Sequence, residues 1–382
     1  MKRKHLMVLI PLLLLNLSAC WDSDEIEDLG IIMAIGLDFL DEESARYSMT
    51  NQYVVPNNIP SSQTGGSVGT PYQNMTLNGD SFLSIIRQNS LESDRPPNYT
   101  HLKSMVVSEK LLRNEPINNI ISFFLRDHEF RRTVPVFITR ENVEDILSIE
   151  PTKEMFPAVQ IKELTQNIDR SLNVQDNLDF GDLSKHISDR SSFVIPEVSI
   201  NQNRIRLTGA AIISNLDHKI AGWLKPDEVG GLKWIKDTVQ GGVVTIDEEH
   251  SGEEPVILEI NKSNTKIEPV LKGDQLSINL SVNASLRLAE DWNVERNVFK
   301  PGWDKEIKKN SEAVVKESIE HVISLAQKEY GLDFLEFYTW VRIQHPDYWM
   351  KHEKEWNSKF SDVPVNVDVD FTLTGYGTQD IN

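Results

Sequence analysis

The sequence predicts an α+β protein of three mixed domains, and its last third carries the clearest pattern. Apolar and polar residues alternate without a break over residues 276–288, and they alternate again over 363–373. A period of two places one face of a strand on a core and the other in water. Between these strands, apolar residues recur at helical spacing over 307–326. We therefore expect an antiparallel sheet covered by this long helix and two shorter helices, the second beginning at Pro346.

The first domain is expected to span residues 29–150. The apolar run at 29–39 predicts a buried strand, and residues 47–55 are predicted to pair with it as a hairpin. A stretch rich in Pro, Asn, Ser and Gly at 56–71 is typical of a loop. Asp80 or Ser81 is suited to cap the next helix. The remaining elements are expected as strands at 101–108 and 134–139 and helices at 117–128 and 143–147.

A smaller middle domain is expected at residues 151–250, with helices first and strands after them. Pro226 opens its last helix, because proline suits a helix's first turn. Its other elements are expected as a mostly helical stretch at 151–192 and strands at 205–214, 220–224 and 243–246. The acidic stretch 248–254 then leads into the third domain, at residues 251–382.

The N-terminus has the pattern of an export signal that ends at the single cysteine of the sequence. A basic start at residues 2–4 precedes an apolar run at 6–15, which is about half of what a membrane-spanning helix needs. Two small residues stand before Cys20, whose thiol can take a diacylglyceryl group. With no second cysteine in the sequence, Cys20 cannot form an internal disulfide. We predict a signal peptide at 1–19 and a lipidated acidic tether at 20–28.

The formal net charge of −19 restricts the partners of this chain. An acidic body is repelled by anionic lipid headgroups and by nucleic acid. The sequence has no basic stripe with interleaved aromatic residues, so nucleic-acid binding is not expected. Two acyl chains on Cys20 suffice for stable anchoring. The expected arrangement is an acidic body that stands off the bilayer and is held by its lipid.

The sequence contains no established pattern for catalysis, metal binding or cofactor binding. It has no paired cysteines, HExxH motif, G-x-S-x-G elbow, Walker loop or dinucleotide fingerprint. His345 and His352 stand seven apart on a predicted helix, where capping or solvated roles are commoner than metal binding. Asp368 and Asp370 fall on the solvent side of the last predicted strand. We expect no enzyme activity, no catalytic residues, no metal and no cofactor.

Four aromatic residues follow one another in the predicted C-terminal helices. These are Trp340, Tyr348, Trp349 and Trp356. Their large apolar surfaces can lock helices onto a sheet, or they can form a shelf for a ligand. The sequence favours the packing role and leaves the shelf open.

Several short blocks, taken in order, resemble the Ger(x)C family of spore germination lipoproteins. They run from the lipid site almost to the end of the sequence, and it is their order that is specific. Ala19 departs mildly, because the family more often has glycine before the cysteine. The blocks are Leu17-Ser18-Ala19-Cys20-Trp21-Asp22, Glu25-Ile26, 31–38, Gly209-Ala210-Ala211-Ile212, Gly222-Trp223-Leu224, Gly231-Leu232-Lys233-Trp234, Leu332-Asp333, Trp340-Val341-Arg342, His345-Pro346, Trp349, Trp356, Phe360, 365–371 and Gly375.

The resemblance implies three α+β domains attached to the outer face of the inner spore membrane or of the cell membrane. It also implies that this chain is one subunit of a receptor for small nutrients. The other subunits of that receptor would be an A subunit, which is a membrane protein, and a B subunit similar to amino-acid transporters. The germinant is then expected in the pocket of the B subunit, while direct contact with this chain stays open. Of the family's functional positions, only Cys20 carries over. The hypothesis is a structural or coupling subunit.

Two other classes remain as alternatives. An extracellular solute-binding lipoprotein would deliver a ligand to a transporter, and it would show two α/β lobes around a cleft. A cell-wall hydrolase has only scattered carboxylates in its favour. The antiparallel C-terminal sheet that we expect is unlike the first alternative.

Overall fold

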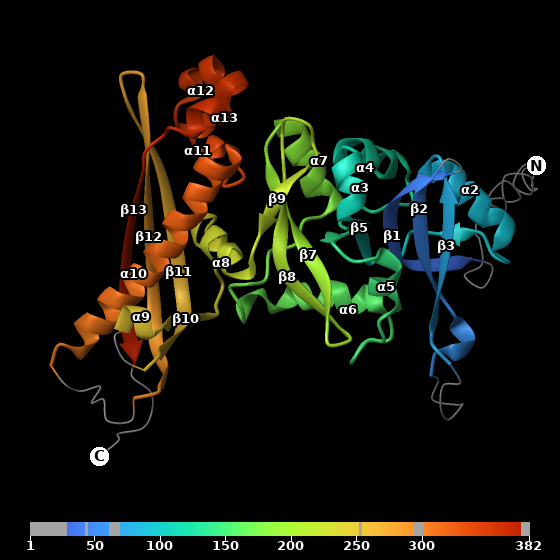
Figure 1. Ribbon diagram of the computed structural model, residues 1–382, viewed down its shortest axis with the longest axis horizontal. Coiled ribbons are helices and arrows are strands. Elements are labelled where there is room, and N and C mark those ends of the chain that lie inside the picture. The colour runs from blue at the N-terminus through green and yellow to red at the C-terminus, as the bar shows by residue number, and fades with distance from the viewer. Residues whose placement is uncertain (1–28, 43–44, 61–68, 252–253, 294–300, 376–382) are drawn as a thin grey trace, which may run out of the picture.

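The structure is a computed structural model that describes residues 29–42, 45–60, 69–251, 254–293 and 301–375. The molecule is elongated, with strands β1–β3 at one end and the C-terminal sheet with its long helix at the other (Figure 1). Strands and helices mix along the whole described chain, which confirms the α+β class.

Within the described residues, the first part of the chain forms one nine-stranded mixed sheet. Its order is β3-β2-β1-β5-β6-β7-β8-β9, and β4 pairs with β1. Neighbours from β1 to β7 run parallel, whereas the flanking pairs are antiparallel. The strands are β1 (Gly30–Glu42), β2 (Ala45–Val54), β3 (Tyr72–Gly79), β4 (Pro97–Asn98), β5 (Ser104–Ser108), β6 (Val136–Thr139), β7 (Phe193–Asn201), β8 (Arg204–Ile213) and β9 (Ile220–Leu224).

Strands from both sides of the expected 150/151 boundary therefore belong to the same sheet. The antiparallel pairing of β1 with β2 confirms the predicted hairpin. Strand β3 was not expected, because its two buried residues, Tyr72 and Leu77, lie on opposite faces and make no alternation. The division into three domains stays a prediction.

Helices cover both faces of this sheet. Strand β5 shows why: Met105 and Val107 belong to one buried cluster and Val106 to another. A strand buried on both sides needs a continuous apolar run, and β5 and β6 have one. The first face carries α2 (Phe82–Glu92), α3 (Glu109–Asn114), α4 (Ile117–Arg126) and α7 (Phe180–Asp189), and the second carries α5 (Val143–Ser148) and α6 (Pro157–Leu164).

Strands β7 and β8 are joined by a tight turn. Gln202 and Asn203 occupy its two central positions with φ of 48° and 59°. Two left-handed residues are the mark of the type I′ turn, whose twist matches that of a hairpin. On β8, Gly209 has a φ of 65°, and a Cβ there would lie 2.4 Å from the carbonyl oxygen of Leu224. This position therefore requires glycine.

The C-terminal part forms a four-stranded sheet in the order β10-β11-β12-β13, within the same described ranges. Its strands are β10 (Val243–Ile246), β11 (Val256–Lys272), β12 (Gln275–Asp291) and β13 (Val365–Gly375). The associated helices are α8 (Pro226–Ile235), α9 (Glu248–Ser251), α10 (Trp303–Ser324), α11 (Phe337–Gln344), α12 (Pro346–His352) and α13 (Trp356–Phe360). The expected long helix and the helix beginning at Pro346 are confirmed.

The expectation of a purely antiparallel sheet is wrong for the last strand. Strand β13 pairs parallel with β12, from Ile278 opposite Val365 to Arg287 opposite Gly375. Parallel neighbours require a long crossover, and α10 to α13 supply one between these two strands. The period of two in residues 363–373 identified a strand with one buried face but carried no information about its direction.

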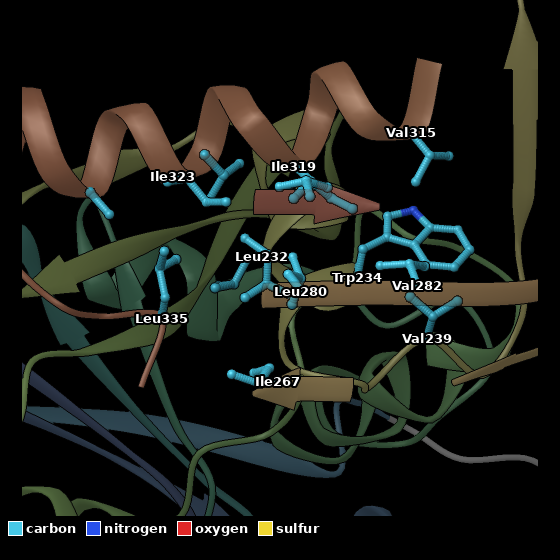
Figure 2. Packing of buried hydrophobic residues seen from close by; sticks show 14 of the residues in the cluster. Leu232, Trp234, Val239, Ile267, Leu280, Val282, Val315, Ile319, Ile323 and Leu335 are labelled. Carbon is cyan, nitrogen blue, oxygen red and sulfur yellow. The ribbon is translucent and has the colours of Figure 1, made fainter. Parts of the chain in front are cut away.

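Helix α8 joins the two sheets through one continuous core. Val194, Ala210 and Ile212 of the large sheet belong to the same buried cluster as α8, α10 and the C-terminal strands. Figure 2 shows Trp234 and Leu232 of α8 lying between α10 and β12. Burial of these large side chains stabilises the junction, since each fully buried aliphatic residue contributes about 1.5–3 kcal/mol.

Candidate functional site

The predicted lipid-attachment residue, Cys20, lies outside the described residues, and so does the acidic tether at 20–28. The lipid site therefore stays a prediction. No described helix has both the length and the apolar character needed to span a membrane.

The histidines and aspartates singled out in the sequence do not form a common site. His345 Nε2 lies 3.1 Å from the carbonyl oxygen of Pro269, whereas buried His352 contacts Glu355 through Nδ1 at 2.6 Å. Asp370 accepts a hydrogen bond from Lys308 Nζ at 2.6 Å on the outer side of the sheet. Across the described ranges, no group of three or more His, Cys, Asp or Glu side chains could hold a metal ion.

The four aromatic residues differ in their surroundings. Trp356 is buried, and its ring lies 5.4 Å from that of Trp349, edge to face. The Tyr348 ring packs 4.5 Å from that of His352, while Trp340 is 40% exposed. Packing thus accounts for Tyr348 and Trp356. Trp349 and Trp356 also line a cavity, so the shelf that the sequence left open has a structural counterpart.

This cavity, of about 550 Å³, lies between the large sheet and the C-terminal helices. One wall is formed by residues 188–192, at the end of α7, together with Asn215 between β8 and β9. The other wall is formed by side chains of α11 and of residues 349–357. The volume is within the range of small-molecule sites. Polar and charged groups predominate among the lining residues.

Asp333 is a buried residue of the cavity lining, with 2% of its surface exposed. Its carboxylate accepts hydrogen bonds from the backbone N–H groups of Phe337 and Tyr338, at 3.1 and 2.7 Å. It also accepts one from Trp356 Nε1, at 2.8 Å. Burial raises the pKa of Asp333 to about 6, although the three donors oppose that rise. One carboxylate thus fixes both the start of α11 and the ring of α13.

An ion pair closes one side of the cavity. Arg342 Nη1 lies 3.1 Å from Asp189 Oδ1, and its guanidinium group lies 5.6 Å from the centre of the Tyr338 ring. Arg190 ends α7 in the left-handed conformation, with a φ of 53°. Asn215 donates to the carbonyl oxygen of Arg190 at 3.0 Å. These contacts join the end of α7 to the helices that follow residue 333.

A second set of ionisable groups lies within the large sheet. Glu197 on β7 is 7% exposed and pairs with Arg140, whose Nε lies 3.2 Å from Glu197 Oε1. The guanidinium carbon of Arg140 lies 3.9 Å from the centre of the Trp223 ring, a close cation–π contact. Burial raises the pKa of Glu197 to about 7, and Arg140 only partly counters it. We assign this set to the structure of the sheet.

Reasoning from the sequence found one wall of the cavity and missed the other. The blocks that carried the family resemblance include Asp333, Arg342, Trp349 and Trp356, which all line it. The opposite wall, at 188–192 and Asn215, had no signal of its own. Its position depends on how the end of α7 and the β8–β9 turn pack against the C-terminal helices, and no local pattern encodes that contact.

Two family models match this chain in succession. The first, described as spore germination protein N-terminal domain, matches residues 22–200. The second, described as spore germination B3/GerAC like, C-terminal, matches residues 208–377.

Curated relatives and a solved structure agree with these matches. Spore germination protein B3 of Bacillus subtilis (strain 168) is 30% identical over 96% of each chain. Spore germination protein A3 of the same organism is 32% identical, also over 96% of each chain. The crystal structure of the GerBC protein is 26% identical, with a TM-score of 0.61, covering 92% of this chain and 99% of that one. The chain therefore belongs to the Ger(x)C family of spore germination proteins.

Proposed function

We propose that this chain is the lipoprotein subunit of a nutrient germinant receptor in the inner spore membrane. It would be anchored to the outer face of that membrane through a diacylglyceryl group on Cys20. Its role is structural or coupling: it binds the A and B membrane subunits of its receptor and catalyses no reaction. The observation that carries this proposal is the family match, which runs in order along almost the entire chain.

Two properties of the chain, its predicted tether and its continuous core, support a role that depends on being held beside partner proteins. Tethering a protein beside its partner replaces free diffusion with a high effective concentration. The core that continues from the large sheet through α8 to the C-terminal sheet gives such a body mechanical continuity. A coupling role would use this continuous packing to carry displacements between the two ends.

The test is a Cys20→Ala substitution in the spore-forming organism, scored by membrane fractionation and by the germination response to nutrients. We expect the variant protein to leave the membrane fraction and the nutrient response to fall. Ala19→Gly is the matched control, because it keeps a small residue at the cleavage site and should leave both readouts unchanged. Normal membrane retention and normal germination of the Cys20→Ala strain would contradict the proposal.

A further inference from the structure

We propose that the cavity between the end of α7 and helices α11–α13 binds a small carboxylate-bearing molecule. This site is separate from the lipid anchor and is independent of the receptor role proposed above. The inference rests on the shape of the cavity, on the charges that face it and on its aromatic wall.

Cationic residues from three elements of an otherwise acidic chain line this cavity. Arg190 comes from the end of α7, Arg342 from α11 and Lys354 from the turn before α13. Arg342 is paired with Asp189, whereas neither Arg190 nor Lys354 forms an ion pair with any described residue. Unpaired cations at a concave site favour an anion, and arginine binds a carboxylate through two parallel hydrogen bonds.

The carboxylates that line the same cavity do not remove its preference for an anion. Asp189 is engaged by Arg342 at 3.1 Å. Asp333 is occupied by three hydrogen-bond donors from the protein itself. Neither Asp333 nor Glu353 forms an ion pair among the described residues, but the oxygens of Asp333 are already taken by those donors, so Glu353, which directly precedes Lys354, is the carboxylate left to compete for a cation. Outside the Arg342–Asp189 pair and the hydrogen-bonded Asp333, the lining thus holds two cations and one carboxylate.

The aromatic wall indicates what else the molecule carries. Trp349 and Trp356 both line the cavity, with Tyr338 beside them at 5.7 Å from the Trp349 ring. Aromatic faces bind planar or apolar groups, while the polar remainder of the lining supplies orientation. The fitting ligand class is therefore a small molecule with one carboxylate and a flat or apolar body.

Such a ligand would connect two parts of the molecule. Arg190 belongs to the layer of helices on the large sheet, and Arg342 and the tryptophans belong to the C-terminal helices. A carboxylate shared between Arg190 and Arg342 adds contacts across this junction. A ligand that binds the folded chain and not the unfolded chain stabilises the fold by mass action.

The test uses benzoate as the probe and benzamide as its neutral analogue, with binding to the purified full chain followed by ligand-observed NMR. We expect saturable binding of benzoate, at least about tenfold weaker binding of benzamide, and quenching or enhancement of tryptophan fluorescence on titration with benzoate. The loss of a charge-assisted hydrogen bond is of that size.

Two substitutions locate the site. Arg190→Gln and Arg342→Gln should each weaken benzoate binding about tenfold. The matched control is Arg131→Gln, since Arg131 is exposed and does not line the cavity. Arg190 is itself exposed, so its substitution leaves the fold intact even if that of Arg342 does not. Equal binding of benzamide, or benzoate binding that survives Arg190→Gln in the folded variant, would overturn the inference.

Discussion

The carboxylate of Asp333 is a single group that holds two helices. Three N–H donors point at its two oxygens, from the first turn of α11 and from Trp356 of α13. Leaving buried donors without an acceptor costs about 1–3 kcal/mol for each. A carboxylate is the only side-chain group of this size that accepts at both ends, so an amide cannot replace it.

Asp333→Asn should therefore lower the free energy of unfolding by about 2–4 kcal/mol. The amide keeps one acceptor oxygen and turns an NH₂ donor toward the donors of α11 or Trp356. Urea denaturation at pH 7 measures the loss. Asp362→Asn is the control, because Asp362 is exposed and, among the described residues, its side chain has only a long contact of 3.7 Å with Lys328. Equal stabilities of the two variants would refute this account of Asp333.

Glu197 makes stability depend on pH near neutrality. Its pKa is raised from 4.5 in an unfolded chain to about 7 by burial. Between these values the folded chain binds more protons than the unfolded chain, so the contribution of Glu197 to stability falls as the pH rises. Relative to Glu197→Gln, the free energy of unfolding of the natural chain should decrease by up to about 3 kcal/mol from pH 5 to pH 8. If the free energies of unfolding of the two proteins changed with pH in parallel, this role of Glu197 would be contradicted.

Two adjacent glycines of α8 give an internally controlled test of how the elements pack. A Cβ on Gly231 would lie 2.6 Å from the backbone oxygen of Ser318 and 2.7 Å from Val322 Cγ2, both on α10. A Cβ on Gly230 meets Leu172 at 3.5 Å, an ordinary contact. Helices α8 and α10 therefore approach as closely as they do only because residue 231 has no side chain.

Gly231→Ala should destabilise the chain by about 1–3 kcal/mol, since the two helices must separate. Gly230→Ala should be neutral or stabilising by up to about 1 kcal/mol, because alanine favours the helical conformation. Thermal unfolding followed by circular dichroism compares the two variants directly. If Gly231→Ala were as stable as Gly230→Ala, the close packing of α8 on α10 would be wrong.

The sequence predicted strands well where one face of the strand is buried and the other is in water. It predicted them less well where the apolar pattern is interrupted. Strand β12 has an unbroken alternation, and the expected stretch 276–288 covers all but the ends of the observed strand, 275–291. Strand β11 runs over 256–272 as one element, although Lys262, Ser263 and Asn264 interrupt its apolar pattern just after a register shift between Ile260 and Lys262. The direction of β13 and the pairing of the large sheet depend on contacts between distant segments, which local periodicity does not contain.

The same limit explains the cavity. In the sequence, Trp349 and Trp356 stand out as large aromatic residues that can pack or bind a ligand, whereas Arg190 and Asn215 do not stand out. Their proximity results from the packing of the end of α7 and the β8–β9 turn on the C-terminal helices. A site built between two parts of a chain becomes visible only when both parts are placed.

At the scale of the whole molecule, the boundary between the two family models falls in a hairpin. The first match ends at residue 200 and the second begins at 208, whereas β7 and β8 pair through a two-residue turn at 202–203. Ala211 and Ile213 of β8 complete the core under α4 and α7. The two matched regions are thus joined within one sheet.

A fragment of residues 29–200 should therefore fail to unfold cooperatively, because it lacks the partner strand of β7 and part of its core. A fragment of residues 29–247 keeps β8, β9 and α8 and should have a cooperative transition. Circular dichroism melts and size-exclusion chromatography distinguish the two. A monomeric fragment 29–200 with a sharp transition would show that the first region is self-sufficient.

The parallel pairing of β13 with β12 also determines the order in which the C-terminal sheet can assemble. During synthesis, residues 275–291 emerge long before residues 365–375, so β12 has an unpaired edge while four helices are still being produced. Unpaired edges and exposed apolar side chains are the features that cause newly made chains to associate with one another. Phe371 arrives among the last of the core residues. The C-terminal unit is thus completed late, and until then the edge of β12 is open to association with other chains.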